Sequence, residues 1–134
     1  ECGHHYARSM SSWALLLALS GFHCDVAAGS ISFAPATGAA EFRCFFSAGT
    51  GWGAFEQQTG ETGLVVGLTL DYGRLHLRRI NLQPVGPATV ATASLNDIIL
   101  PLRIAHANGA TAIEFATLIE LTGGDRLNIK LTTS

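Results

Sequence analysis

Residues 64–82 read LVVGLTLDYGRLHLRRINL, with apolar and polar residues alternating on both sides of Asp71-Tyr72-Gly73. Leu75 and Leu77 fall on one face of this pattern and the residues around them on the other, which is the two-residue period of a half-buried β-strand. The Asp-x-Gly triplet carries residues that are typical of a turn. The stretch therefore predicts two strands with a turn between them, Leu64–Asp71 and Arg74–Leu82.

Similar segments follow one another from Gly21 onward. Turn residues separate them, such as Asn108-Gly109 and Gly123-Gly124-Asp125, and Pro84 and Pro87 mark the expected crossover. Short strands with turns at this spacing are typical of an antiparallel β-sandwich, which we predict for residues 22–134. The remaining expected strands are Ser30–Phe33, Phe42–Ala48, Trp52–Gln58, Thr89–Leu95, Ile98–His106, Ala112–Leu121 and Arg126–Thr132.

One helix is expected, from His4 to Ser20, because apolar residues recur there at helical spacing without a proline. Gly21 offers a glycine stop, and Phe22 follows where such a cap has an apolar contact. Small residues line one side of this helix and bulky ones another, so it is apolar on nearly all sides, as a buried helix is. Since the remaining chain could cover one face at most, we expect further helices to cover the rest. The bulky side consists of Tyr6, Met10, Trp13 and Leu17.

The composition also indicates a chain that packs against something else. Hydrophobic residues make up 48% of it and charged residues 13%, against about 25% charged in an ordinary soluble domain. The sequence begins at Glu1, directly before the helix, and we expect it to be cut from a longer protein. The net charge of −2, without a basic stripe, excludes a nucleic-acid partner. The longest uncharged apolar run, Trp13 to Leu19, is far shorter than the roughly 20 residues of a membrane span, so no span is expected.

The sequence contains no complete set of residues for catalysis, metal binding or phosphate binding. The glycines of residues 49–53 lack the following helix that a phosphate loop requires. Histidines and cysteines near the two ends of the helix are about 25 Å apart, too far for one metal ion. No Gly-x-Ser-x-Gly elbow occurs, and the carboxylates mostly fall at turns or strand ends. We therefore predict no catalytic residue, metal or cofactor in this chain. The odd number of cysteines, 3, favours reduced thiols in a cytoplasmic protein.

Polar and aromatic residues crowd the beginning of the otherwise apolar helix, namely Glu1, His5, Tyr6 and Arg8. His5 and Arg8 are three residues apart and share a face, and Glu1 lies one turn before His5. One explanation is structural: Glu1 faces the positive end of the helix dipole and Arg8 pairs with a neighbour. The other is a sugar-binding site, since charged hydrogen-bonding groups and aromatic faces hold sugars. The residue types alone favour the structural explanation and leave both open.

The stretch from Glu1 to Ala14, ECGHHYARSMSSWA, resembles the last barrel segment of bacterial proteins related to glycoside hydrolase family 116, a family that includes the non-lysosomal glucosylceramidase. The family's helix pattern Tyr-x-Arg-x-x-Ser-x-Trp-Ala is matched at Tyr6, Arg8, Ser11, Trp13 and Ala14. Gly21-Phe22, Phe33-Ala34-Pro35 and most of residues 45–53 are similar to the tail that these bacterial relatives carry. The resemblance covers Glu1 to about Gln58, and from Gly60 onward it is a general likeness to a β-domain.

This resemblance implies an (α/α)6 barrel that hydrolyses β-glucoside-type substrates with retention, by one nucleophilic and one acid/base carboxylate. Both carboxylates lie upstream in the family, so none of the residues present here takes either role. Residues 1–21 would form the last barrel helix, and residues 22–134 a C-terminal β-domain. Glu1, His5, Tyr6 and Arg8 would form one wall of the sugar site. The implied partners are a carbohydrate substrate and the N-terminal barrel of the same protein.

Two other functions are compatible with the sequence. A carbohydrate-binding sandwich would use Trp52, Phe55 and Tyr72 as a sugar platform, and would need these aromatic rings exposed and coplanar. A purely structural or interaction module would account for the low charge alone.

Overall fold

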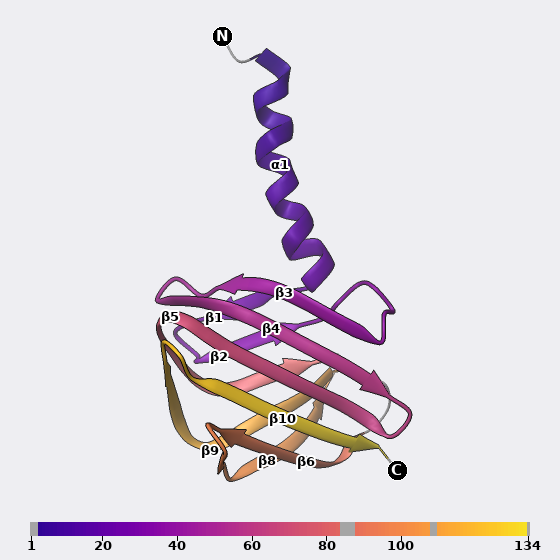
Figure 1. The fold of residues 1–134 in the computed structure, drawn as a ribbon, viewed down its shortest axis with the longest axis vertical. Helices are drawn as coiled ribbons and strands as arrows, with labels where there is room; N and C mark the ends of the chain where they lie inside the picture. The colour runs from indigo at the N-terminus through magenta and orange to yellow at the C-terminus, as the bar shows by residue number, and fades with distance from the viewer. Residues whose placement is uncertain (1–2, 84–87, 108–109, 134) are drawn as a thin grey trace.

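The computed structural model describes residues 3–83, 88–107 and 110–133, and of residues 3–10 the backbone alone. The chain is mainly β, with one helix and one mixed sheet (Figure 1). The elements are α1 (Gly3–Ser20), β1 (His23–Asp25), β2 (Ser30–Phe33), β3 (Glu41–Ser47), β4 (Gly51–Gly60), β5 (Gly63–Leu82), β6 (Ala88–Leu95), β7 (Ile98–Ile99), β8 (Leu102–Ala107), β9 (Ala110–Thr122) and β10 (Arg126–Thr133).

The sheet folds over on itself, so that two layers face each other across the core (Figure 1). In the first layer the order is β3, β4, the first half of β5, β10, β6 and β7. In the second layer it is β1, β2, the second half of β5, β9 and β8. β5 therefore belongs to both layers. It ends in the second layer and β6 begins in the first, while the predicted crossover at residues 84–87 lies outside the described residues.

The predicted turn at Asp71-Tyr72-Gly73 is wrong, because β5 runs through it as one strand of 20 residues. The triplet is instead the place where the strand bends from one layer into the other. Gly73 has a φ of 83°, and a Cβ on it would lie 2.2 Å from the carbonyl oxygen of Thr50. Only glycine accepts this backbone conformation and this close approach together. The turn-forming residues thus serve a bend within a strand.

Two further expectations need correction. The layers are not purely antiparallel, because β2 pairs with β5 in parallel, with Ser30 opposite Arg79. The predicted strand Ile98–His106 is divided into β7 and β8, because Pro101 lies between them and a proline has no N–H for a ladder. The sequence predicts no strand at β1, because three residues are too few to show an alternating pattern. The other predicted strands are confirmed with small shifts at their ends, as is the turn at residues 123–125, whereas Asn108-Gly109 lies outside the described residues.

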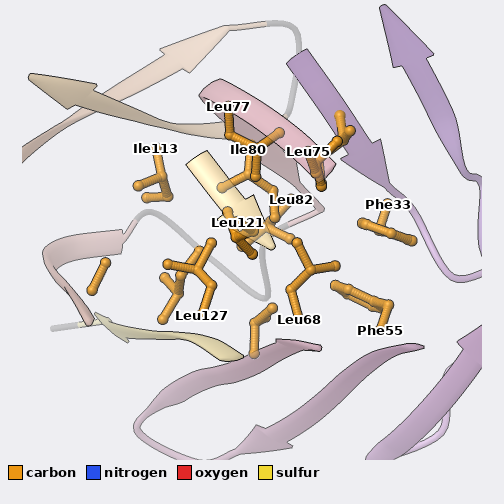
Figure 2. Packing of buried hydrophobic residues seen from close by; sticks show 14 of the residues in the cluster. Phe33, Phe55, Leu68, Leu75, Leu77, Ile80, Leu82, Ile113, Leu121 and Leu127 are labelled. Atoms are coloured by element: carbon orange, nitrogen blue, oxygen red, sulfur yellow. The ribbon is translucent and has the colours of Figure 1, made fainter. Parts of the chain in front are cut away.

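Aromatic and aliphatic side chains from both layers fill the space between them (Figure 2). Phe33 of the second layer stacks on Phe55 of the first, with ring centroids 3.8 Å apart and planes 8° from parallel. Leu68, Leu77 and Leu121 belong to the same core and are completely buried. Burying each such side chain stabilises the fold by about 1.5–3 kcal/mol, so the two layers hold each other without help from α1.

α1 extends away from the two layers rather than packing on them (Figure 1). The sequence predicts a helix that further helices would bury, and in the described part of this chain every residue from Ser11 to Leu19 is exposed. The burial of α1 by other helices stays a prediction. Only the last turn is held. The N–H groups of Ala36 and Ala34 donate to the carbonyls of Leu19 and Ser20 at 2.9 and 3.0 Å. The predicted stop is confirmed, since Gly21 N–H donates to the carbonyl of Leu17 at 2.8 Å and closes the helix.

Candidate functional site

The sugar-site residues predicted from the sequence lie at the far end of α1. His5, Tyr6 and Arg8 belong to its first turns, and their side chains are outside the described part, as is Glu1 altogether. A helix of 18 residues is about 27 Å long at 1.5 Å per residue. Figure 1 shows the beginning of α1 well away from the β-layers. The described β-layers therefore add nothing to a site at that end, and the hypothesis of a sugar site there stays a prediction.

The middle of α1 presents a large apolar surface, which we call the apolar helix surface: Trp13, Leu15, Leu16, Leu17 and Leu19. Trp13 is 81% exposed, and the four leucines are exposed as well. At 100° per residue, Trp13 and Leu15 lie about 200° apart around the helix axis, so the surface faces in opposite directions. A helix of this kind is ordinarily buried on all sides, and large exposed apolar patches mark interaction sites.

A second exposed apolar feature lies on the first layer, where Phe45 of β3, Trp52 of β4 and Tyr72 of β5 form an aromatic strip. The three residues are 49%, 43% and 66% exposed. The rings of Trp52 and Tyr72 lie 22° from parallel with centroids 6.0 Å apart, and Phe45 is 6.1 Å from Trp52 at 38°. The strip therefore offers adjacent aromatic faces to solvent.

Local backbone geometry creates this strip. Trp52 and Tyr72 are direct partners across β4 and β5, and the register shifts immediately after Trp52. Gly53, the next residue, lies so close to β5 that a Cβ on it would be 1.9 Å from the carbonyl oxygen of Thr69. The bulge thus needs glycine, and it places two aromatic side chains opposite each other on the outer face.

Of the three residues that the sequence suggests for a sugar platform, Trp52 and Tyr72 are exposed, but Phe55 is completely buried in its stack with Phe33 (Figure 2). Phe45, and not Phe55, is the third exposed ring beside Trp52 and Tyr72. The alternation in β3 carries the signal for this, since Cys44 and Phe46 point into the core and Phe45 between them points out.

The described residues contain little that favours acid–base, nucleophilic or metal chemistry. Hydrogen bonds from Arg103 and Arg79 lower the pKa of Glu114, and the backbone N–H of Thr122 lowers that of Asp125. This is the opposite of the raised pKa that a glycosidase acid requires. Burial raises the pKa of Cys44 to about 11, which suppresses the reactive thiolate. Among the described side chains, no three metal-ligating groups come together.

Two observations bear on membranes and on relatives. Within the described residues, no helix has both the length and the apolar character that crossing a bilayer requires. A comparison with models of protein families found no match to the chain, and a comparison with curated protein sequences found none of significant similarity.

Proposed function

We propose that this chain is the C-terminal part of a retaining β-glycoside hydrolase that acts on β-glucoside-type substrates. In this proposal residues 1–21 form the last helix of an (α/α)6 barrel and residues 22–134 the β-domain that follows. Glu1, His5, Tyr6 and Arg8 form one wall of the sugar site, and the two catalytic carboxylates come from the preceding barrel.

The apolar helix surface is the observation that carries this proposal. Trp13 and Leu15 face opposite directions and are both exposed, so a single flat partner could not cover them. An inner helix of a barrel is surrounded by neighbouring helices and would bury both sides. Exposing this much apolar area to water is unfavourable, at about 25 cal/mol for each Å². The match of Tyr6, Arg8, Ser11, Trp13 and Ala14 to the family's helix pattern supports the same placement.

The chain of residues 1–134 alone is expected to hydrolyse no glycoside, because the proposal takes both catalytic carboxylates from elsewhere in the protein. The longer protein should release the aryl group from an aryl β-glucoside. The measurement is the release of nitrophenol from a nitrophenyl β-glucoside by each purified protein. Turnover by residues 1–134 that disappears when one of their own carboxylates is changed to an amide would overturn this division. An inactive longer protein would refute the enzyme class for this substrate.

A second candidate function is sugar binding by the β-domain itself, and the aromatic strip is the observation that favours it. Sugars place their C–H faces on exposed aromatic rings, and Trp52 and Tyr72 offer two nearly parallel rings on one outer face. This function does not require the barrel. It is compatible with the first proposal, in which the strip would hold the substrate's distant part.

Trp52→Ala is expected to abolish measurable binding of a β-glucan oligosaccharide, because it removes the central ring of the strip. The fold should survive, since the side chain is partly exposed and lies outside the core. Binding is measured by calorimetry, with Leu118→Ala as the control: Leu118 is exposed to a similar degree on β9 of the other layer. Equal affinity in the original chain and in Trp52→Ala, or no binding to the original chain, would argue against this function.

A further inference from the structure

The outer face of the second layer carries a row of polar residues in register across neighbouring strands. Ser30 on β2 is opposite Arg79 on β5, which is opposite Glu114 on β9, which is opposite Arg103 on β8. Arg79 and Arg103 each donate to a different carboxylate oxygen of Glu114. One carboxylate therefore lies between two guanidinium groups.

An irregularity in the sheet adds a third arginine to this row. Between Leu77 and Arg79 the pairing of β5 with β9 is interrupted, and the partner shifts from Ile119 to Glu114. Leu77 and Ile80 are both buried, whereas Arg78 and Arg79 between them are both exposed. In a regular strand adjacent residues point to opposite faces, so the irregularity turns two neighbouring arginines toward solvent. Bulges of this kind often redirect a side chain at a functional site.

Arg78 brings a charge that nothing in the described part of the chain neutralises. Its backbone N–H donates to the carbonyl of Gly29 at 2.7 Å, but its guanidinium has no ion-pair partner among the described residues. Together with Glu114 the three arginines leave an excess of two positive charges in one place. This contrasts with the net charge of −2 for the whole chain. Of the charges nearby, Arg74 and His76 share Glu120. Asp25 stands opposite Ser30 in the register, and the hydrogen bond that it accepts from the N–H of Ala28 does not neutralise its carboxylate, so counting Asp25 the excess is one positive charge.

These groups surround a shallow depression of about 380 Å³ on that face. It is lined by Ala28, Ser30, Arg78, Arg79, Arg103, Glu114 and Phe115. A guanidinium has five N–H donors, so Arg79 and Arg103 keep donors free after bonding Glu114. Planar guanidinium groups match the oxygens of phosphate and carboxylate groups, and such charge-assisted hydrogen bonds are among the strongest in proteins.

We propose that the depression between Arg78, Arg79 and Arg103 binds a doubly charged oxyanion, the phosphate group of a small phosphate monoester. Such an oxyanion is opposite in charge to the three guanidinium groups, which Glu114 offsets only in part. The guanidinium of Arg78 binds the phosphate oxygens, and the N–H donors of Arg79 and Arg103 that do not bond Glu114 donate to the same oxygens. The Ser30 hydroxyl, also at the depression, is a further donor. This inference is independent of the glycosidase proposal.

Inorganic phosphate at pH 7.5 and constant ionic strength is the probe, followed by backbone amide NMR shifts of the chain. Saturable shifts confined to residues around the depression are expected, with sulfate competing and the monoanion acetate binding much more weakly. Arg78→Gln should weaken phosphate binding at least tenfold, and Arg78→Lys should restore part of it by returning the charge. Arg43→Gln is the matched control, since Arg43 is an exposed arginine paired with Glu56 on the other layer.

Shifts that spread over all arginines without saturating would show general screening of charge and overturn the site. The same holds if Arg78→Gln and Arg43→Gln bind phosphate equally well, or if acetate matches phosphate. Arg103→Gln is a second variant at the other end of the depression and should also weaken binding. A normal amide spectrum for each variant separates loss of the site from loss of the fold.

Discussion

Trp13→Ala in the proposed full-length enzyme should lower its free energy of unfolding by about 3–5 kcal/mol, the usual cost of truncating a buried tryptophan. In residues 1–134 alone the same change should alter it by less than about 0.5 kcal/mol, because Trp13 is exposed there. Leu15→Ala, on the other side of α1, should cost about 2–5 kcal/mol in the longer protein. Urea denaturation of both proteins, monitored by circular dichroism, measures these differences.

Val26→Ala is the control for this comparison, because Val26 is also a large exposed apolar residue but belongs to the segment between β1 and β2. It should have a small effect in both proteins. If Trp13→Ala and Leu15→Ala are equally harmless in the longer protein, α1 is not enclosed by a barrel and the proposal loses its main support. If only Trp13→Ala is costly, α1 packs on one side and is not an inner barrel helix.

Arg8→Ala in the longer protein should reduce kcat/KM for an aryl β-glucoside tenfold or more, while its melting temperature changes little. A charge-assisted hydrogen bond to a sugar hydroxyl contributes roughly 1.5–3 kcal/mol, and tenfold corresponds to about 1.4 kcal/mol of transition-state stabilisation. Glu1→Ala should act in the same direction. Arg8→Lys should recover part of the loss, because lysine keeps the charge but not the planar fork of donors.

Arg43→Ala serves as the control for Arg8→Ala, since it removes an exposed guanidinium from β3, whereas Arg8 lies in the first turns of α1. Both kcat/KM and the melting temperature should stay near their original values. A contrary result is equally clear. If Arg8→Ala melts several degrees lower and the folded fraction keeps full activity, Arg8 and Glu1 are capping and helix-pairing groups, as their residue types alone suggest.

Alternation predicted most of the strands because one face of each is buried and the other is not. Its failures occur where a residue serves two purposes. Asp71-Tyr72-Gly73 has the composition of a turn, but Gly73 is required because the strand bends against Thr50. Phe55 and Phe45 have the same side chain, so the residue type does not reveal which of them points into the core. The alternation within β3 does, since Cys44 and Phe46 on either side of Phe45 are buried.

The two other surfaces differ in how far the sequence predicted them. The apolar character of α1 and its need for partners follow from the wheel of residues 4–20, but the exposure of Trp13 depends on which helices are present. The arginine depression was not visible in the sequence. Arg78 and Arg79 look like part of an alternating strand, and only the interrupted pairing with β9 turns both outward. Glu114 and Arg103 lie beside them because β9 and β8, which follow β5 at a distance in the sequence, pair so that Glu114 is opposite both Arg79 and Arg103.

The continuity of β5 also constrains how the β-part comes apart. Its first half forms ladders with β4 and β10, and its second half with β2 and β9. Neither layer can open without releasing a strand that the other layer holds, so local fluctuations in one are coupled to the other. Such coupling favours a single cooperative transition over stepwise melting. Because β5 must recruit partners from both ends of the chain, its assembly requires many contacts between distant residues, and this slows folding.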